Sequence, residues 1–138
     1  MTLSDYEKTI SLWKKTPGIG LSTADKRINV ESFLNRNSDT SFVALNGNEI
    51  IGTVLCGSDG RRGYMYHLVV KETWRKREIG KMLVKKCLTA LQHRGIEKCH
   101  LFVYATNKDA MKFYEKLGWQ ERVELKIFSS PTAASRKE

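Results

Sequence analysis

Two apolar runs on either side of one helical stripe constrain the fold of this chain more than any other feature. The runs are YMYHLVV (64 to 70) and CHLFVY (99 to 104), and each is apolar enough for a strand covered on both faces. Between them, apolar residues recur at intervals of three and four from Ile79 to Leu91, which is typical of an amphipathic helix. This order predicts a βαβ unit with parallel strands and a right-handed crossover.

Two helices are predicted before this unit. They cover residues 4 to 15 and 24 to 37, and we expect the second to bury Ile28, Ser32 and Leu34. The loop TPGIGLSTAD separates them, and its proline and glycines stop the first helix.

A hairpin, a last helix and a last strand complete the predicted elements. SFVAL (41 to 45) and IIGTVLC (50 to 56) flank an Asn-Gly turn, which is a strong hairpin pattern. TNKDAMKFYEKLGW (106 to 119) predicts a helix that ends at a glycine. QERVELKIFS (120 to 129) predicts a final strand region.

Length and composition indicate one domain. A chain of 138 residues with 41% hydrophobic residues can bury one core, so we expect a single domain over residues 1 to 130 and a flexible tail over residues 131 to 138. No apolar run approaches the ~20 residues of a membrane-spanning helix, and the first residues do not resemble a secretion signal. These features predict a cytoplasmic protein that does not enter a membrane.

Cysteines and histidines give no metal or disulfide pattern. Cys56, Cys87 and Cys99 form no CxxC pair, and we expect them to be buried, reduced thiols. The three histidines are scattered, and no cluster has the ligand spacing of a zinc site, so we expect no metal.

The net charge of +9 predicts an anionic partner, and more than half of it lies in one segment. Residues 71 to 86 hold seven basic and two acidic residues, an excess of five. Because this segment joins a predicted strand to a predicted helix, the unpaired amides at the helix start would add to its attraction for phosphate. A solvated basic face explains the charges equally well at this point.

Known phosphate motifs do not match this turn. The Gly80-Lys81 pair lacks the following Ser or Thr and the earlier glycine of a P-loop, and the segment is not a GxGxxG pattern. Nucleotide hydrolysis and dinucleotide redox chemistry are therefore disfavoured.

Two blocks together resemble the GNAT superfamily of acetyl-CoA-dependent N-acetyltransferases. They are VKETWRKREIGKMLV (70 to 84) and, about thirty residues later, NKDAMKFYEKLGW (107 to 119), and the order of elements fits over roughly residues 4 to 129. The resemblance implies an α/β (α+β) fold of the GNAT type. Its central sheet is mixed and mostly antiparallel, with a parallel, splayed βαβ pair and helices on both faces. It also implies acetyl-CoA as cosubstrate and a primary amine of a small molecule or peptide as acceptor.

The cofactor residues follow from the family's pattern Arg/Gln-x-x-Gly-x-Gly/Ala, which falls on residues 75 to 80. Here Arg75 and Gly80 match, while Glu78 replaces the first glycine. The resemblance implies that the backbone at seven positions holds the pyrophosphate: Arg75, Lys76, Arg77, Glu78, Ile79, Gly80 and Lys81. It implies that the preceding strand bonds the pantetheine arm through Leu68, Val69 and Val70.

The second block implies one acid and one further cofactor contact. Tyr114 matches the family's general acid, and a phenol with an ordinary pKa of ~10 is still protonated at neutral pH. The alternative interpretation is that Tyr114 is a core aromatic residue beside Phe113. Asn107 matches the asparagine near the thiol end of the cofactor, and a plain helix cap explains it almost as well.

The sequence leaves the identity of the general base open. His67 has a suitable ordinary pKa near ~6.5, but a satisfied core histidine or a water relay explains the sequence too. Asp25 is a separate case: it could attract the acceptor amine, although a short acid in a loop is more often a helix cap.

The departures from the family pattern keep other functions open. Glu78 would resist the positive φ that a glycine accepts, and it adds negative charge near the phosphates, whereas Lys76 offsets that charge. An acyl-CoA-binding protein without efficient catalysis is therefore one alternative. A basic nucleic-acid-binding module is another, disfavoured because the cations belong to a helix start. A homodimer is neither indicated nor excluded, and the short N-terminus leaves no clear first strand.

Overall fold

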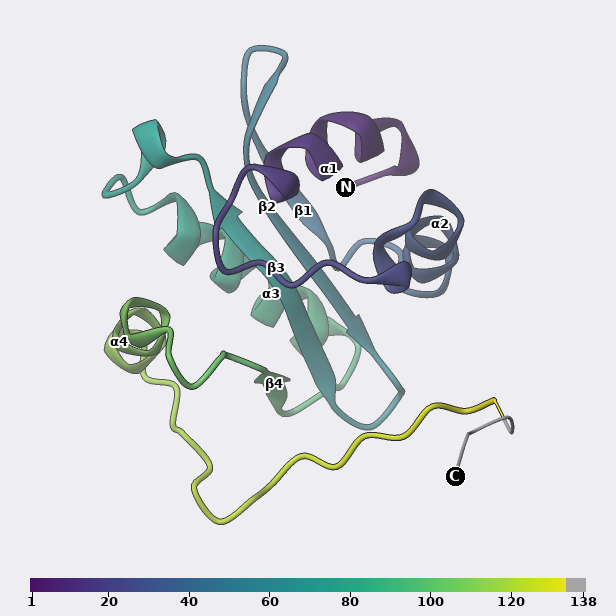
Figure 1. The fold of residues 1–138 in the computed structure, drawn as a ribbon, viewed down its shortest axis with the longest axis vertical. Helices are drawn as coiled ribbons and strands as arrows, with labels where there is room; N and C mark the ends of the chain where they lie inside the picture. The colour runs from purple at the N-terminus through teal and green to yellow at the C-terminus, as the bar shows by residue number, and fades with distance from the viewer. Residues whose placement is uncertain (134–138) are drawn as a thin grey trace. The chain divides into compact units, whose positions relative to one another are not determined.

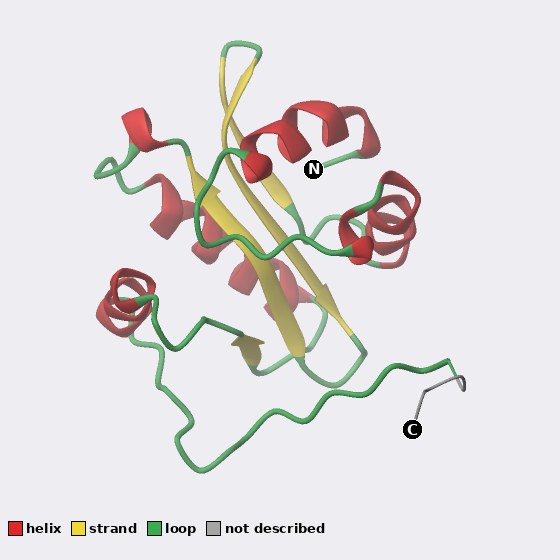
Figure 2. Ribbon diagram, in the orientation of Figure 1, coloured by secondary structure: helices red, strands yellow, loops and turns green. Residues whose placement is uncertain are grey.

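The computed structural model describes residues 1 to 133, so the last five residues of the predicted tail lie outside the described part. The chain forms two compact units, Met1–Asn107 and a second unit that begins at Lys108. Figure 1 shows the path of the chain, and Figure 2 marks its helices and strands. The boundary of a single domain at residue 130 remains a prediction.

The first unit begins with short helices. They are η1 (Leu3–Asp5), α1 (Tyr6–Lys14), η2 (Thr23–Asp25) and α2 (Arg27–Arg36). In the described chain no strand precedes α1. The two predicted helices are present, each extended at its start by a turn of 3-10 helix that closes with a capping box.

The predicted buried face of α2 is wrong in part. Ile28 is 72% exposed, whereas Val30 is 2% exposed and packs into the core. The helix starts only at Arg27 and carries few apolar residues. The spacing of its apolar residues therefore does not identify its buried face. Tertiary packing against the sheet decides it.

The sheet has four strands in the order β1-β2-β3-β4. They are β1 (Phe42–Asn46), β2 (Glu49–Ser58), β3 (Gly63–Val70) and β4 (Cys99–Leu101). β1, β2 and β3 are antiparallel neighbours, and β4 runs parallel to β3. The predicted hairpin is confirmed, with Asn46 opposite Glu49 and Gly47 at φ 60°. The predicted βαβ unit is confirmed as well.

The parallel pair splays soon after it starts. β4 faces β3 only at the three pairs from Gly63 with Cys99 to Met65 with Leu101. The run CHLFVY was expected to continue as a strand to residue 104, but β4 ends at Leu101. In the described chain, residues 66 to 70 therefore have β2 on one side and no strand on the other.

Helices cover both faces of this sheet. α3 (Ile79–His93) lies behind the sheet in Figure 1, and α1 and α2 lie in front of it. α3 buries four side chains at helical spacing against the strands: Leu83, Val84, Cys87 and Leu91. On the opposite face, Trp13 of α1 packs with Leu55 and Val69. The expected mixed sheet with helices on both faces is confirmed.

The second unit contains α4 (Lys108–Lys116) and an irregular segment. The predicted strand at residues 120 to 129 is wrong, because residues 117 to 133 include no strand. Its alternating apolar residues are exposed: Val123, Leu125 and Ile127 at 57 to 77%. Alternating apolar residues are compatible with a β-strand, but a strand forms only where a neighbouring strand accepts and donates its backbone hydrogen bonds.

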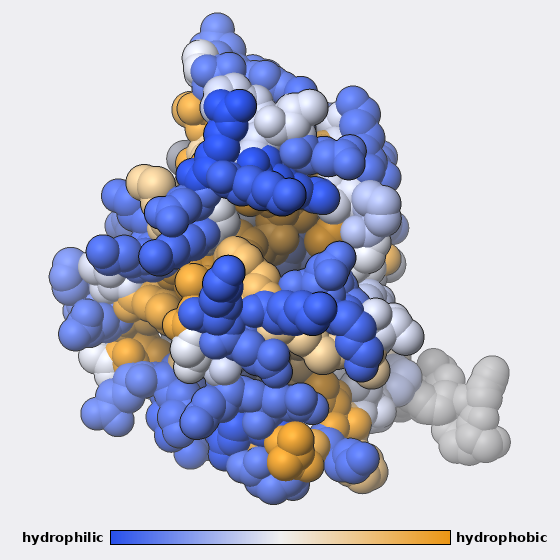
Figure 3. All heavy atoms as spheres, turned by 90° about the vertical axis from the view of Figure 1, so that its left-hand side faces the viewer, coloured by the Kyte–Doolittle hydropathy of each residue, from blue (hydrophilic) through white to orange (hydrophobic). Residues whose placement is uncertain are grey.

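Within residues 1 to 133, no helix is both long and apolar enough to cross a bilayer. In the same residues, no group of three or more His, Cys, Asp or Glu side chains could hold a metal ion. Hydrophilic residues predominate on the face drawn in Figure 3, with hydrophobic patches between them.

Candidate active site

The turn between β3 and α3 has an unusual backbone. It runs from Val70 through η3 (Glu72–Trp74) to the start of α3 at Ile79. Lys76 and Glu78 both lie in the left-handed region, at φ 65° and 64°. A side chain there costs roughly 1 to 2 kcal/mol compared with the right-handed form. The chain thus adopts at these two positions the conformation for which glycine is the usual residue.

The start of α3 offers unpaired amides to an anion. Glu78 is the N-cap residue, and its side chain makes no capping hydrogen bond. Its carbonyl accepts the amide of Met82 at 3.0 Å, so the helix is regular from its first turn. The amides of the first turn therefore carry the positive end of a helix dipole with no side chain covering them.

Four cations at the start of α3 and in the residues just before it divide into two pairs. Arg75 donates from Nε to the carbonyl of Val70 at 3.0 Å, and the Arg77 guanidinium lies 4.7 Å from the centre of the Trp74 ring. These two shape the turn. Lys76 and Lys81 are exposed and form no ion pair among the described residues. Their ammonium groups can follow a phosphate without losing a partner.

A β-bulge interrupts β3 beside this turn. Tyr66 pairs with Leu55 and Val69 pairs with Thr53, so His67 and Leu68 together face one residue of β2. His67 has φ 52°. The bulge lies in the part of β3 that has no β4 neighbour, and Leu68, Val69 and Val70 lie between it and the turn.

His67 is held by contacts from three other elements. Its Nε2 lies 2.8 Å from Oδ1 of Asp25, and its ring meets the Trp13 ring edge-on at 4.6 Å between centres. Its carbonyl accepts the Thr53 hydroxyl at 3.1 Å, and that hydroxyl also accepts the Trp13 indole N–H at 2.8 Å. About 15% of the His67 side chain remains exposed, so the ring is not sealed.

The loop after α1 passes close to residues that follow β4. A Cβ atom at Gly20 would lie 2.4 Å from the Tyr104 hydroxyl, so a side chain there would require the exposed Tyr104 side chain to move. A Cβ atom at Gly18 would lie 3.6 Å from the Asn107 amide nitrogen. The structure thus brings the predicted Asn107 beside the loop that separates the first two helices.

The two residues of the second block lie on either side of a unit boundary. Asn107 ends the first unit and directly precedes α4, in the N-cap position. Tyr114 lies on α4 in the second unit, with its ring 5.1 Å from Phe113 and 5.6 Å from Trp119. Its backbone carbonyl accepts the amides of Leu117 and Trp119, which close the helix.

The three cysteines are free thiols that pack in or near the core. Cys56 and Cys87 are buried, and Cys99 is partly buried. A hydrogen bond with the Cys87 thiol, reinforced by burial, raises the pKa of Cys56 to about 12. A hydrogen bond with Cys56 and burial also raise the pKa of Cys99. A thiol that resists ionisation is a poor nucleophile.

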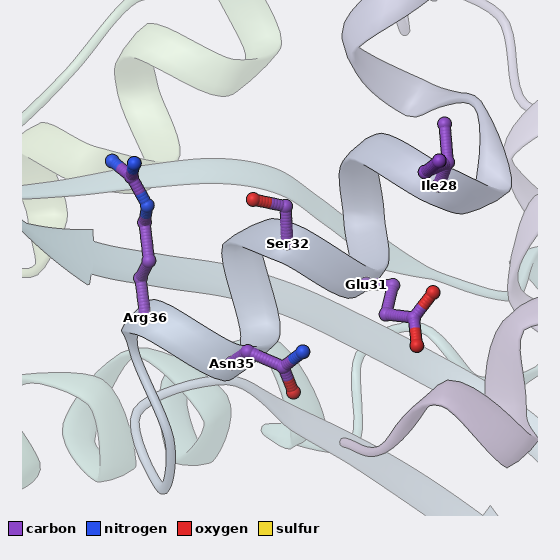
Figure 4. A pocket seen from close by; sticks show the side chains of 5 residues that line it. All are labelled: Ile28, Glu31, Ser32, Asn35 and Arg36. Carbon is purple, nitrogen blue, oxygen red and sulfur yellow. The ribbon is translucent and has the colours of Figure 1, made fainter.

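A shallow depression of about 300 Å³ lies elsewhere, on the outer side of α2. Five residues of this one helix line it: Ile28, Glu31, Ser32, Asn35 and Arg36. Figure 4 shows their side chains projecting from the helix without converging on one point. This surface lacks the converging polar groups of an active site.

Comparisons with known proteins agree with this geometry. The profile described as the acetyltransferase (GNAT) family matches residues 6–119. An acetyltransferase of Pectobacterium atrosepticum is 34% identical over 116 residues, which cover 84% of this chain and 82% of the relative.

Two solved structures share the fold. The PaiA N-acetyltransferase of Thermoplasma acidophilum, in complex with coenzyme A, aligns with a TM-score of 0.73 at 20% identity and covers 85% of this chain and 84% of its own. AAC(6')-Iy, in complex with the bisubstrate analogue CoA-S-monomethyl-acetylneamine, aligns with a TM-score of 0.74 at 19% identity, covering 96% and 95%.

Proposed function

The chain belongs to the acetyltransferase (GNAT) family and is an acetyltransferase, and we propose that it transfers the acetyl group of acetyl-CoA to a primary amine of a small molecule or peptide. One observation carries this proposal. In the described chain, the stretch of β3 without a strand neighbour leads through one turn to the uncapped start of α3, so a free strand edge and amides suited to phosphate follow each other closely in sequence.

The residues present fit acetyl-CoA, which supplies an acetyl group already activated as a thioester. The amides from Arg75 to Lys81 receive the pyrophosphate, with Lys76 and Lys81 neutralising its charge. The backbone of Leu68, Val69 and Val70 bonds the amides of the pantetheine arm along the open edge of β3. Asn107 contacts the arm near its thiol end.

The chemistry that we propose is direct attack. The amine nitrogen bonds to the thioester carbonyl carbon, and main-chain N–H groups around Val69 stabilise the negative charge on its oxygen. His67 accepts the proton that the amine loses. The carbon–sulfur bond then breaks, and the leaving sulfur takes a proton from the Tyr114 hydroxyl, so an amide and a free thiol result. The neutral thiols of Cys56 and Cys99 argue against a covalent acyl-cysteine.

The acceptor is tested by measuring the release of coenzyme A with a panel of primary amines. The panel contains an aminoglycoside, because the aligned AAC(6')-Iy structure holds an acetylneamine analogue, together with spermidine and a lysine-containing peptide. We expect amine-dependent release with at least one of them, and calorimetric binding of coenzyme A without any amine. Binding without turnover on any amine would favour an acyl-CoA-binding protein instead.

Tyr114→Phe tests the proposed acid. Losing a general acid typically costs about 10²- to 10⁴-fold in rate, so we expect kcat to fall by roughly 10²-fold while the Kd for coenzyme A stays near wild type. Tyr64→Phe is the matched control, because Tyr64 lies in β3 with its ring stacked on Phe102. Equal kcat values for Tyr114→Phe and wild type would remove Tyr114 from the mechanism.

A further inference from the structure

The proposed base is paired with a carboxylate that no sequence pattern connects to it. Asp25 lies in η2, 42 residues before His67, and the two side chains meet at 2.8 Å while 8% and 15% exposed. We propose that Asp25 is a positioning residue that holds His67 in the tautomer with hydrogen on Nε2, leaving Nδ1 to accept the amine's proton. This inference rests on the proposed function.

The hydrogen bonds of Asp25 determine which nitrogen carries the hydrogen. Its Oδ2 accepts the amide of Ser22 at 3.0 Å, which closes the capping box of η2, and its Oδ1 faces Nε2 of His67. An ionised carboxylate accepts hydrogen bonds and donates none. Nε2 must therefore donate, and in the neutral ring Nδ1 then holds the lone pair.

The rest of His67 is fixed strongly enough for this bond to matter. A residue at φ 52° inside a bulge persists only where its surroundings hold it. Thr53 bonds its carbonyl, and Trp13 packs edge-on against its ring. With backbone and ring plane held in this way, the bond to Asp25 decides which nitrogen is protonated.

Two nearby side chains, those of Tyr6 and Arg27, form their contacts with groups other than the Asp25 and His67 side chains. The Tyr6 hydroxyl donates to the carbonyl of Asp25 at 2.6 Å, and the Arg27 guanidinium lies over the Tyr6 ring and pairs with Glu7 at 3.3 Å. Among the described residues, no lysine or arginine forms an ion pair with Asp25. Within residues 1 to 133, His67 is thus the side chain that faces Oδ1 of this carboxylate.

Asp25→Asn is the informative substitution. The carboxylate accepts from two donors, Ser22 N–H and His67 Nε2–H, but an amide offers only one oxygen. If the Asn oxygen accepts the fixed Ser22 N–H, the Asn NH2 group faces Nε2 of His67 and must donate a hydrogen bond to it. The ring then moves its hydrogen to Nδ1, and the lone pair proposed to accept the proton is lost.

The chain contains a matched control. Asp5 closes the capping box of η1 in the same way, accepting the Thr2 amide at 2.9 Å, and it has no histidine partner. Asp5→Asn therefore removes the same charge from the same kind of turn. We expect it to leave both the state of His67 and turnover unchanged.

The tautomer is measured directly by ¹⁵N NMR of the histidine ring at about pH 8, where an ordinary imidazole is neutral. We expect hydrogen on Nε2 of His67 in the wild type and in Asp5→Asn, and on Nδ1 in Asp25→Asn. Hydrogen on Nδ1, or on both nitrogens, in the wild type would overturn the proposal. The wild-type spectrum decides this even if Asp25→Asn does not fold.

Turnover with the best amine of the panel separates positioning from folding. In Asp25→Asn we expect kcat to fall by roughly 10²-fold or more, as for loss of a general base, while the Kd for coenzyme A stays within about twofold. A shifted tautomer with unchanged kcat would overturn the role of Asp25. If no amine reacts with the wild type, the proposed function fails, and the tautomer still tests the contact.

Discussion

At the level of single residues, the turn before α3 places side chains where the backbone favours glycine. Glu78 and Lys76 both have φ near 65°. Strain of this kind tends to persist where a backbone must present its amides in a fixed direction, and here those amides begin α3. The sequence suggested that Glu78 would resist the left-handed conformation. In the structure Glu78 adopts it, at a cost in conformational free energy.

Glu78→Gly tests that cost. Relief of the left-handed strain outweighs the extra freedom of glycine in the unfolded chain, so we expect the free energy of unfolding to rise by roughly 0.5 to 1 kcal/mol. The affinity for coenzyme A should rise too, because a negative charge leaves the phosphate site. Urea unfolding and calorimetry measure the two effects.

Glu78→Ala separates strain from charge. It removes the same carboxylate but keeps a Cβ atom in the left-handed region. We expect it to gain affinity for coenzyme A without gaining stability. Equal stability of the glycine and alanine variants would show that the turn stores no strain at this position.

At the level of elements, the bulge of β3 is fastened to α1 through one hydroxyl of β2. Thr53 is fully buried, donates to the His67 carbonyl and accepts the Trp13 indole N–H. The same group thus holds the bulge and satisfies a buried donor, so strand and helix are positioned together.

Thr53→Val removes this hydroxyl while keeping the shape of the side chain. The Trp13 N–H would lose its partner in the core, and an unsatisfied buried donor costs about 1 to 3 kcal/mol. We expect a loss of roughly 2 kcal/mol in urea unfolding. Thr53→Ser keeps the hydroxyl and loses only a methyl group, so it should be the milder variant. The reverse order would contradict this function of the hydroxyl.

At the level of the whole molecule, the Cys56 thiol of β2 and the Cys99 thiol of β4 make stability depend on alkaline pH. The Cys56 thiol has a pKa of about 12 in the folded protein, compared with an ordinary value of 9.0. Because the fold favours the neutral form, this contribution is complete below pH 9 and is lost as the pH rises through about 12. We expect the unfolding free energy to fall by up to about 1.4 kcal/mol per pH unit within that window.

Urea unfolding of the wild type and of Cys56→Ala between these limits checks that slope. The variant should show a shallower pH dependence, with a remaining slope from Cys99, whose pKa is raised in the same direction. Identical slopes would mean that other groups control the alkaline range.

Sequence reasoning predicted those features of the fold that local patterns determine. The hairpin, the βαβ unit and α4 each follow from a period and a turn. It failed where distant segments decide: the end of β4 at Leu101, the exposed Ile28 and the absent strand at residues 120 to 129. For the candidate site it named His67 and Asp25 separately and did not predict their contact, because 42 residues separate the pair.

The splay of β3 from β4 also affects the protein when no cofactor is bound. Within the described part of the chain, no strand lies on one side of residues 66 to 70, and an unpaired strand edge can template association with another chain. A bound pantetheine arm would cover the same backbone groups. If acetyl-CoA binds as proposed, it would then protect the enzyme from self-association through this edge as well as supply its acetyl group, and the cell's supply of coenzyme A would influence how readily the free protein associates.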